Sequence, residues 1–216
     1  MDQERNSRSV QAMPTLALRG LVAFPDVTMH FDVKRPKSIL AIKAAMDLQR
    51  ELFIVTQENI EAEDPTEEDL YGVGVVCVIK QLLKADESTI RVLIEGKYRA
   101  KLVNVLSREP FLLCDIRKMP KTSRKKHTDE EIEGLMRLVK TMFGQYCAAL
   151  PNVSRDIVSR AMAKETPEEL FTAIVPNLLC AYEDKQFLLE QTGAYASLEA
   201  LAEVLDHECT LLEIEH

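Results

Sequence analysis

The chain has 216 residues, of which 46% are hydrophobic, so it can bury a core in one large domain or two small ones. Its formal net charge of −8 at pH 7 argues against a broad basic face of the kind that nucleic-acid-binding domains present. No apolar run approaches the roughly 20 residues that span a bilayer, and the opening MDQERNSRSVQA lacks the apolar core of a signal peptide. We therefore expect a soluble, cytoplasmic protein.

The five cysteines give no sign of a disulfide framework or a zinc site. Their number is odd, they are widely spaced, and no CxxC pair occurs. We expect reduced, mostly buried thiols and no bound metal.

The first half of the chain begins with a stretch, residues 1–12, that we expect to be a disordered lead-in. Residues 15–18 and 27–33 are predicted to be strands, and Pro36 opens a helix because proline suits a first helical turn. A buried strand is expected at 51–56. The acidic segment QENIEAEDPTEEDLYG follows, and it lacks the ligand spacing and central glycine of a calcium loop, so we expect a solvated loop.

Residues 72–117 are typical of β-structure. STIRVLIEG alternates apolar and polar side chains at the period of a half-buried strand, and Gly96 is expected to break the run before YRAKLVNVLS resumes it. Several strands joined by short breaks predict an antiparallel sheet that is closed or nearly closed into a barrel.

The polar, basic segment MPKTSRKKHT, residues 119–128, predicts a linker between domains, after which the strand pattern stops. Thr128 and Glu131 have the spacing of a capping box at the start of a helix that ends before Pro151. Shorter helices are expected from Ser154 and from Thr166, and Pro176 predicts either a kink or a boundary.

The last helix is expected from about residue 195 to residue 216. Leu198, Leu205 and Leu212 recur at intervals of seven and Leu201 adds a fourth position, so the pattern fits either a coiled-coil seam or an ordinary amphipathic helix. No C-cap precedes the end, which predicts that the helix belongs to a longer one.

The common catalytic motifs are missing from the sequence. It contains no GxxxxGK[ST] phosphate loop, no HExxH pair and no GxSxG elbow, and its four histidines are scattered. Nothing singles out a nucleophile with a base beside it. No catalytic, cofactor-binding or metal-binding residue is therefore predicted, and a freestanding enzyme becomes a weaker hypothesis.

Two segments together resemble the start of the ATP-dependent Lon proteases. The first is PTLALRGLVAFPDVTMHFDVKRPKSILAIKAAM and the second is DLYGVGVVCVIKQLLKADESTIRVLIEGKYRAKL. The matching positions are Pro14, Leu16, Leu18, Arg19, Val22, Phe24, Pro25, Arg35 and Ser38, then Gly72, Gly74, Val92, Glu95, Gly96, Arg99 and Ala100. The chain departs from the family pattern at Gly20, His30 and Lys34, and the similarity spans residues 13–118.

The resemblance implies an α+β protein: a PUA-like antiparallel β pseudo-barrel with one helix (13–118), the linker (119–128), and a helical bundle (129–216) that ends in a long helix. It implies the substrate-recognition and assembly region of a hexameric Ser–Lys protease that degrades misfolded and regulatory proteins. ATP and Mg would serve only the full-length protein. The fragment, a monomer or weak dimer, would bind unfolded or tagged protein without cleaving it, and no membrane or nucleic-acid partner is expected.

A substrate-binding patch should be apolar and exposed. Large apolar residues stand at two breaks between strands, and we take them as candidate substrate-binding residues: Leu21, Val22, Phe24 and Pro25 at the first break, Leu82 and Leu83 at the second. The alternative is that all six belong to the core at the end of the barrel. The rival function is RNA binding, which PUA-like barrels can perform, although the acidic charge and sparse aromatic residues weigh against it.

Overall fold

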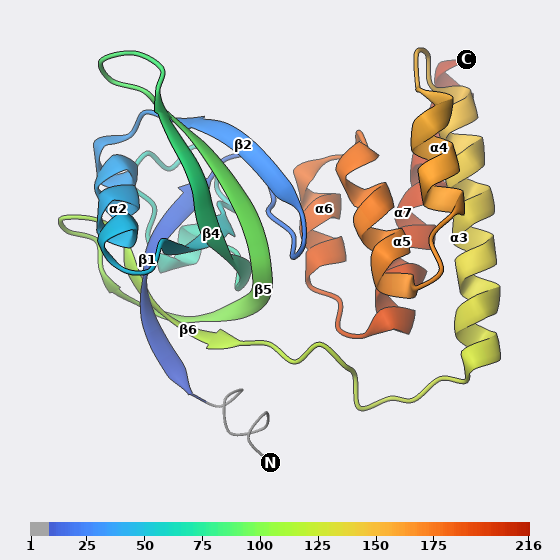
Figure 1. The fold of residues 1–216 in the computed structure, drawn as a ribbon, viewed down its shortest axis with the longest axis horizontal. Coiled ribbons are helices and arrows are strands. Elements are labelled where there is room, and N and C mark those ends of the chain that lie inside the picture. The colour runs from blue at the N-terminus through green and yellow to red at the C-terminus, as the bar shows by residue number, and fades with distance from the viewer. Residues whose placement is uncertain (1–8) are drawn as a thin grey trace. The chain divides into compact units, whose positions relative to one another are not determined.

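The computed structural model describes residues 9–216. They form two compact units, which divide between Pro120 and Lys121 (Figure 1). Most of the expected disordered lead-in, residues 1–8, lies outside the described residues. Its last part was predicted wrongly, because the first strand already begins at Val10.

Within residues 9–120, the first unit is a six-stranded sheet with a helix and a short 3₁₀ turn. The strands are β1 (Val10–Leu18), β2 (Thr28–Val33), β3 (Glu51–Thr56), β4 (Val73–Lys84), β5 (Ile90–Ser107) and β6 (Leu113–Lys118). The helix is α2 (Pro36–Asp47), and the 3₁₀ turn is η1 (Glu67–Asp69).

The sheet closes on itself through its longest strand. The strand order is β2-β5-β4-β3-β1-β6, and β5 also pairs with β6, so five strands form a ring while β2 lies outside it on the first half of β5 (Figure 1). The predicted α+β pseudo-barrel is confirmed. One pairing differs from the antiparallel expectation: β1 and β3 run parallel, because β2 and α2 carry the chain back between them. α2 packs against β1 and β3.

Two strands differ from the sequence prediction: β1 begins at Val10, before the predicted start at residue 15, and β5 continues through Gly96. Val10–Pro14 pair with β6, which gives the backbone of residues 10–12 its hydrogen bonds. In β5 the predicted alternation is confirmed, since Val92 and Ile94 are fully buried. The predicted break at Gly96 is wrong: β5 runs through it, and the glycine instead accommodates the backbone of Phe24, which passes against it.

The second unit, Lys121–His216, is helical. Its helices are α3 (Asp129–Ala149), α4 (Arg155–Met162), α5 (Pro167–Ile174), α6 (Tyr182–Leu189) and α7 (Ala194–Glu215), and η2 (Val175–Asn177) is a 3₁₀ turn. The capping box of Thr128 and Glu131 is confirmed at the start of α3. Pro176 marks a boundary, because α5 ends at Ile174 and the chain continues as η2.

The leucine pattern of α7 belongs, in its first half, to the core of the helical unit. Leu198, Leu201 and Leu205 are fully buried, and α7 packs mainly against α3. The amphipathic alternative therefore holds for this part of the helix rather than a coiled-coil seam. Among the helices of residues 9–216, none combines the length and apolar character that crossing a membrane requires.

Candidate functional site

The first predicted apolar group follows β1 and is only partly exposed. Val22 and Phe24 are buried, with 8% and 4% of their surface accessible, and Pro25 is half-buried beside Gly96. Leu21 is 42% exposed, and its carbonyl accepts a hydrogen bond from the Thr56 hydroxyl at 2.7 Å. Leu21 is therefore the residue of this group whose side chain a partner can reach, while Phe24 acts as core.

The second predicted group lies on the hairpin formed by β4 and β5. Leu82 stands opposite Val92, which is fully buried, so Leu82 faces the inside of the sheet. Leu83 stands opposite Arg91 on the outer face and is 51% exposed. Contact between substrate and any of the six residues stays a prediction, and Leu21 and Leu83 are the pair that the structure leaves most accessible.

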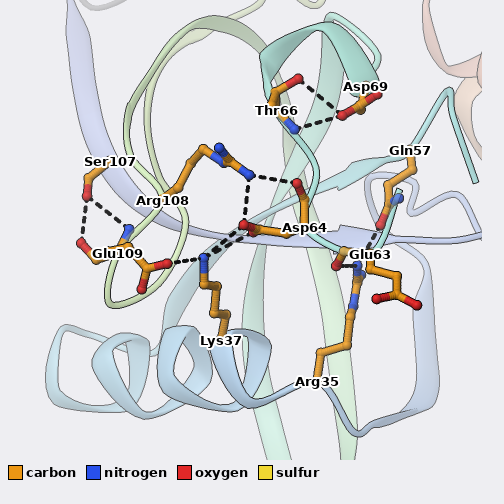
Figure 2. A network of polar contacts seen from close by, with 10 residues as sticks. All are labelled: Arg35, Lys37, Gln57, Glu63, Asp64, Thr66, Asp69, Ser107, Arg108 and Glu109. Carbon is orange, nitrogen blue, oxygen red and sulfur yellow. Dashed lines mark hydrogen bonds and ion pairs between the residues drawn. The ribbon is translucent and has the colours of Figure 1, made fainter. Parts of the chain in front are cut away.

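A cleft with many charged side chains in its lining, which the sequence does not predict, lies where β1, the start of α2, the loop before η1 and the turn between β5 and β6 meet (Figure 2). Its volume is about 670 Å³. We call it the larger cleft. Its charged lining residues are Arg19, Arg35, Lys37, Glu63, Asp64, Arg108 and Glu109.

The loop between β3 and η1 is held in place by buried and capped polar groups. The amide of Gln57 is fully buried, and its nitrogen donates to the carbonyls of Asn59 (3.1 Å) and Ala62 (2.9 Å). At the start of η1 the Asp69 carboxylate accepts from the backbone N–H of Thr66 at 2.9 Å (Figure 2). That bond is the main cause of the lowered pKa of Asp69. The acidic loop is thus an ordered wall of the cleft.

Arg35 joins three parts of the cleft wall. Its guanidinium donates to the carbonyl of Ala17 on β1 (2.5 Å), to the side-chain oxygen of Gln57 (2.8 Å) and to the carbonyl of Glu63 (3.3 Å). Burial lowers its pKa, and the neighbouring charge of Arg19 lowers it further. Arg19 is exposed and donates to the carbonyl of Ala62 at 3.0 Å.

On the other side of the larger cleft, charges of both signs neutralise one another. Asp64 accepts from Lys37 at 3.1 Å and from Arg108 at 2.7 Å, and Lys37 also pairs with Glu109 (Figure 2). The hydrogen bond to Glu109 is the main reason that the pKa of Lys37 is raised. These exposed pairs contribute little to stability individually, but they connect α2 to the loop and to the β5–β6 turn.

A smaller cleft of about 330 Å³ adjoins the larger one. Both clefts are lined by Ala17, Arg19, Arg35 and Ser38, so they lie on either side of these residues. The smaller cleft adds the apolar side chains of Leu21 and Phe31. In the sequence, Arg19, Arg35 and Ser38 are marked only by their match to the Lon pattern, and this match is the one indication of the site that the sequence contains.

The thiols form no disulfide in the structure. Cys77, Cys114 and Cys147 are buried and Cys180 and Cys209 are half-buried, all as free cysteines. Burial raises the pKa of each of these thiols. Across residues 9–216, no three histidine, cysteine or acidic side chains gather in a way that could hold a metal ion.

Comparison with known proteins gives the chain its family. Residues 12–207 match the ATP-dependent protease La (Lon) substrate-binding domain. Curated relatives named Lon protease include one from Heliobacterium modesticaldum, 35% identical over 99% of this chain, and one from Brevibacillus choshinensis, 36% identical over 94%. The chain spans about a quarter, 26%, of the length of these relatives.

Solved structures agree at the level of the fold. The N-terminal domain of a Lon protease from the Mycobacterium avium complex superposes with a TM-score of 0.67 at 17% identity, covering 93% of this chain and 98% of that one. A Lon N-terminal domain protein from Xanthomonas campestris gives 0.61 at 11% identity, covering 88% and 96%. With the family match extending over both units, this chain belongs to the family of Lon protease N-terminal substrate-binding domains.

Proposed function

We propose that this chain is the substrate-recognition and assembly region of an ATP-dependent Lon-type serine protease. The observation that carries the proposal is the family match over residues 12–207 in a chain that spans 26% of whole Lon proteases. In this proposal the chain binds unfolded or tagged proteins and does not cleave them. ATP hydrolysis, peptide-bond hydrolysis by a Ser–Lys pair and stable hexamer formation belong to the full-length cytoplasmic protein.

The surface features of the first unit suit such a role. An unfolded polypeptide differs from a folded one in offering extended backbone and apolar side chains. Leu21 and Leu83 expose apolar surface at 42% and 51%. The two clefts beside α2, of about 670 and 330 Å³, provide concave surface next to Leu21. These features support binding by contact with side chains and backbone of an unstructured segment.

The direct test is the binding of this chain to one fluorescent reporter protein in its folded state and in a permanently unfolded variant. Fluorescence anisotropy should show binding to the unfolded form and much weaker binding to the folded form. Equal or undetectable binding to both forms would contradict recognition by this chain. A filter-binding assay with single-stranded RNA across salt concentrations serves as the control for the rival function, and salt-dependent RNA binding in preference to the unfolded reporter would favour that rival.

A further inference from the structure

Arg19 and Arg35 place two positive charges where the two clefts meet. Both residues line both clefts, and each feels the other's charge, which contributes to the lowered pKa of Arg35. Their hydrogen-bond acceptors in the described part of the chain are uncharged: backbone carbonyls for both residues and the Gln57 amide oxygen for Arg35. The two guanidiniums therefore keep their positive charge without a carboxylate bound to either.

Two of the three acidic side chains that line the larger cleft are paired with other basic groups. Asp64 is shared by Lys37 and Arg108, and Glu109 pairs with Lys37. In the smaller cleft, Asp32 is bound by Arg91 at 2.9 Å. Glu63 contributes its backbone carbonyl to Arg35, and its carboxylate is the third acidic group in the lining of the larger cleft. Four basic side chains (Arg19, Arg35, Lys37, Arg108) and three acidic ones (Glu63, Asp64, Glu109) line the larger cleft, so its lining keeps a net charge of +1 although the whole chain is acidic.

The start of α2 adds to this charge. Pro36 occupies the first turn and no side chain caps the helix, so the first-turn amides of Lys37 and Ser38 have no acceptor within the helix. Ser38 lines both clefts. A helix N-terminus favours negative charge, and here it lies beside two arginines that line the same cavity.

The clefts also have room for an extended chain. β6 pairs with β1 only at Val10–Pro14, and the N–H of Thr15 still donates to the carbonyl of Leu112 at 2.8 Å, so that edge of β1 has no strand beside it from Leu16 onward. Arg35 occupies the carbonyl of Ala17. The clefts continue on both sides of the arginines, and Leu21 exposes an apolar side chain in the smaller one. Because cleft surface lies on both sides of the arginines, an extended ligand with an anionic group in its middle fits better than a ligand whose anionic group is at its end.

We propose that the joined clefts bind an extended segment of unfolded polypeptide through an internal acidic side chain, which Arg19, Arg35 and the first turn of α2 hold, while a neighbouring apolar side chain packs on Leu21. The proposal rests on the proposed function and makes it more specific: the substrate class is unfolded protein that carries Asp or Glu next to apolar residues. Charge complementarity selects the acidic residue, and the cleft selects an unstructured backbone.

The test compares two fluorescent, C-terminally amidated peptides that are identical except for one central residue, Glu in the first and Gln in the second. The Glu peptide should bind this chain about tenfold more tightly, which corresponds to about 1.4 kcal/mol. The preference should shrink as salt is added, because the guanidinium of Arg19 is exposed. In ¹⁵N-labelled protein, the amides of Lys37 and Ser38 should shift with the Glu peptide.

Variants locate the effect. Arg19→Gln should abolish the preference for Glu, and its fold should survive because Arg19 is exposed and donates to one carbonyl. Arg117→Gln is the matched control, since it removes the same charge from an exposed position on β6 and should keep the preference. Arg35→Lys keeps the charge but cannot reach all three of its present acceptors, so the preference should weaken.

The outcomes separate this inference from the proposed function. If both peptides and the unfolded reporter bind without a preference for Glu, or if Arg19→Gln keeps that preference, the acidic-residue proposal is wrong while substrate recognition stands. If the reporter and both peptides all fail to bind, both proposals are wrong. If inorganic phosphate shifts the Lys37 and Ser38 amides more strongly than the Glu peptide does, the clefts bind small anions and the peptide proposal is overturned.

Discussion

A substitution at Gly96 tests whether the close contact between this glycine and the backbone of Phe24 stabilises the sheet unit. A Cβ atom added there would lie 2.0 Å from the carbonyl oxygen of Phe24 and 2.7 Å from its carbonyl carbon. Real Cβ atoms essentially never come within 3.0 Å of a neighbour, so the segment around Phe24 must move by about 1 Å. Gly96→Ala should therefore destabilise the sheet unit.

The magnitude follows from the contacts that such a movement breaks. The N–H of Gly96 donates to the carbonyl of Val27 and the N–H of Asp26 donates to the carbonyl of Gly96, each at 3.0 Å. Each backbone bond contributes about 1 kcal/mol net, and forcing extra volume against the buried Phe24 costs about 1–3 kcal/mol. The expected loss is about 3–5 kcal/mol, a large part of the stability of an ordinary domain.

Gly72→Ala is the matched control, because a Cβ at Gly72 meets no heavy atom within 4 Å. It should leave stability unchanged or raise it by up to about 1 kcal/mol. Guanidinium denaturation followed by circular dichroism measures both variants, and hydrogen exchange of the β5 amides identifies the transition that belongs to the sheet unit. Equal denaturation midpoints for the two variants would refute the reasoning, since they would mean that the segment around Phe24 can move away from residue 96 without loss of stability.

Three further predictions follow from burial and capping. Phe24→Asp should lower the free energy of unfolding of the sheet unit by about 3 kcal/mol or more, because the Phe24 side chain is only 4% exposed. Leu83→Asp should change it by no more than about 0.5 kcal/mol, because Leu83 is 51% exposed. Thermal denaturation measures both variants, and a larger loss for Leu83→Asp than for Phe24→Asp would contradict this reasoning. Burial raises the pKa of the Cys114 thiol to about 11 in the folded protein. The stability that this shift contributes is fully present below the pKa of about 8.5 in the unfolded chain and is lost as the pH rises toward 11. Denaturation measured against pH should show this loss of stability in the wild type and not in Cys114→Ala. Thr128→Ala removes the capping box of α3 and should cost about 1 kcal/mol by denaturation, while a similar loss in Thr128→Ser would argue against the cap.

The sequence predicts a helix or strand well where all the side chains that stabilise it lie within one short segment. The alternation of β5 and the capping box of α3 are of this kind, because the side chains involved are sequence neighbours. In the sequence, Gly96 predicts a break, because glycine weakens the interior of a strand. Its actual reason, the close passage of Phe24, lies far away in the sequence and could not be read from the residues beside it.

The candidate site was predictable only in part, for the same reason. Apolar residues at strand breaks point to Leu21 and Leu83, but the exposure of these side chains depends on the register of β4 with β5 and on the contact of Phe24 and Pro25 with Gly96. The clefts beside α2 were missed because they combine residues as distant as Arg19 and Arg108. In the sequence, Arg19 and Arg35 stand out only as positions that resemble the family pattern.

The two arginines also differ in a way that separates a structural role from a binding role. Arg35 has acceptors on β1, on Gln57 and on the loop, so its place in the fold is sufficient reason for its presence. Arg19 is exposed, donates to one carbonyl and repels Arg35, so folding gains little from its charge. Arg19→Gln should therefore leave stability unchanged or slightly raised while the preference for acidic peptides disappears. A loss of stability that parallels the loss of binding would mean that Arg19 is part of the scaffold, and the anion site would then need another explanation.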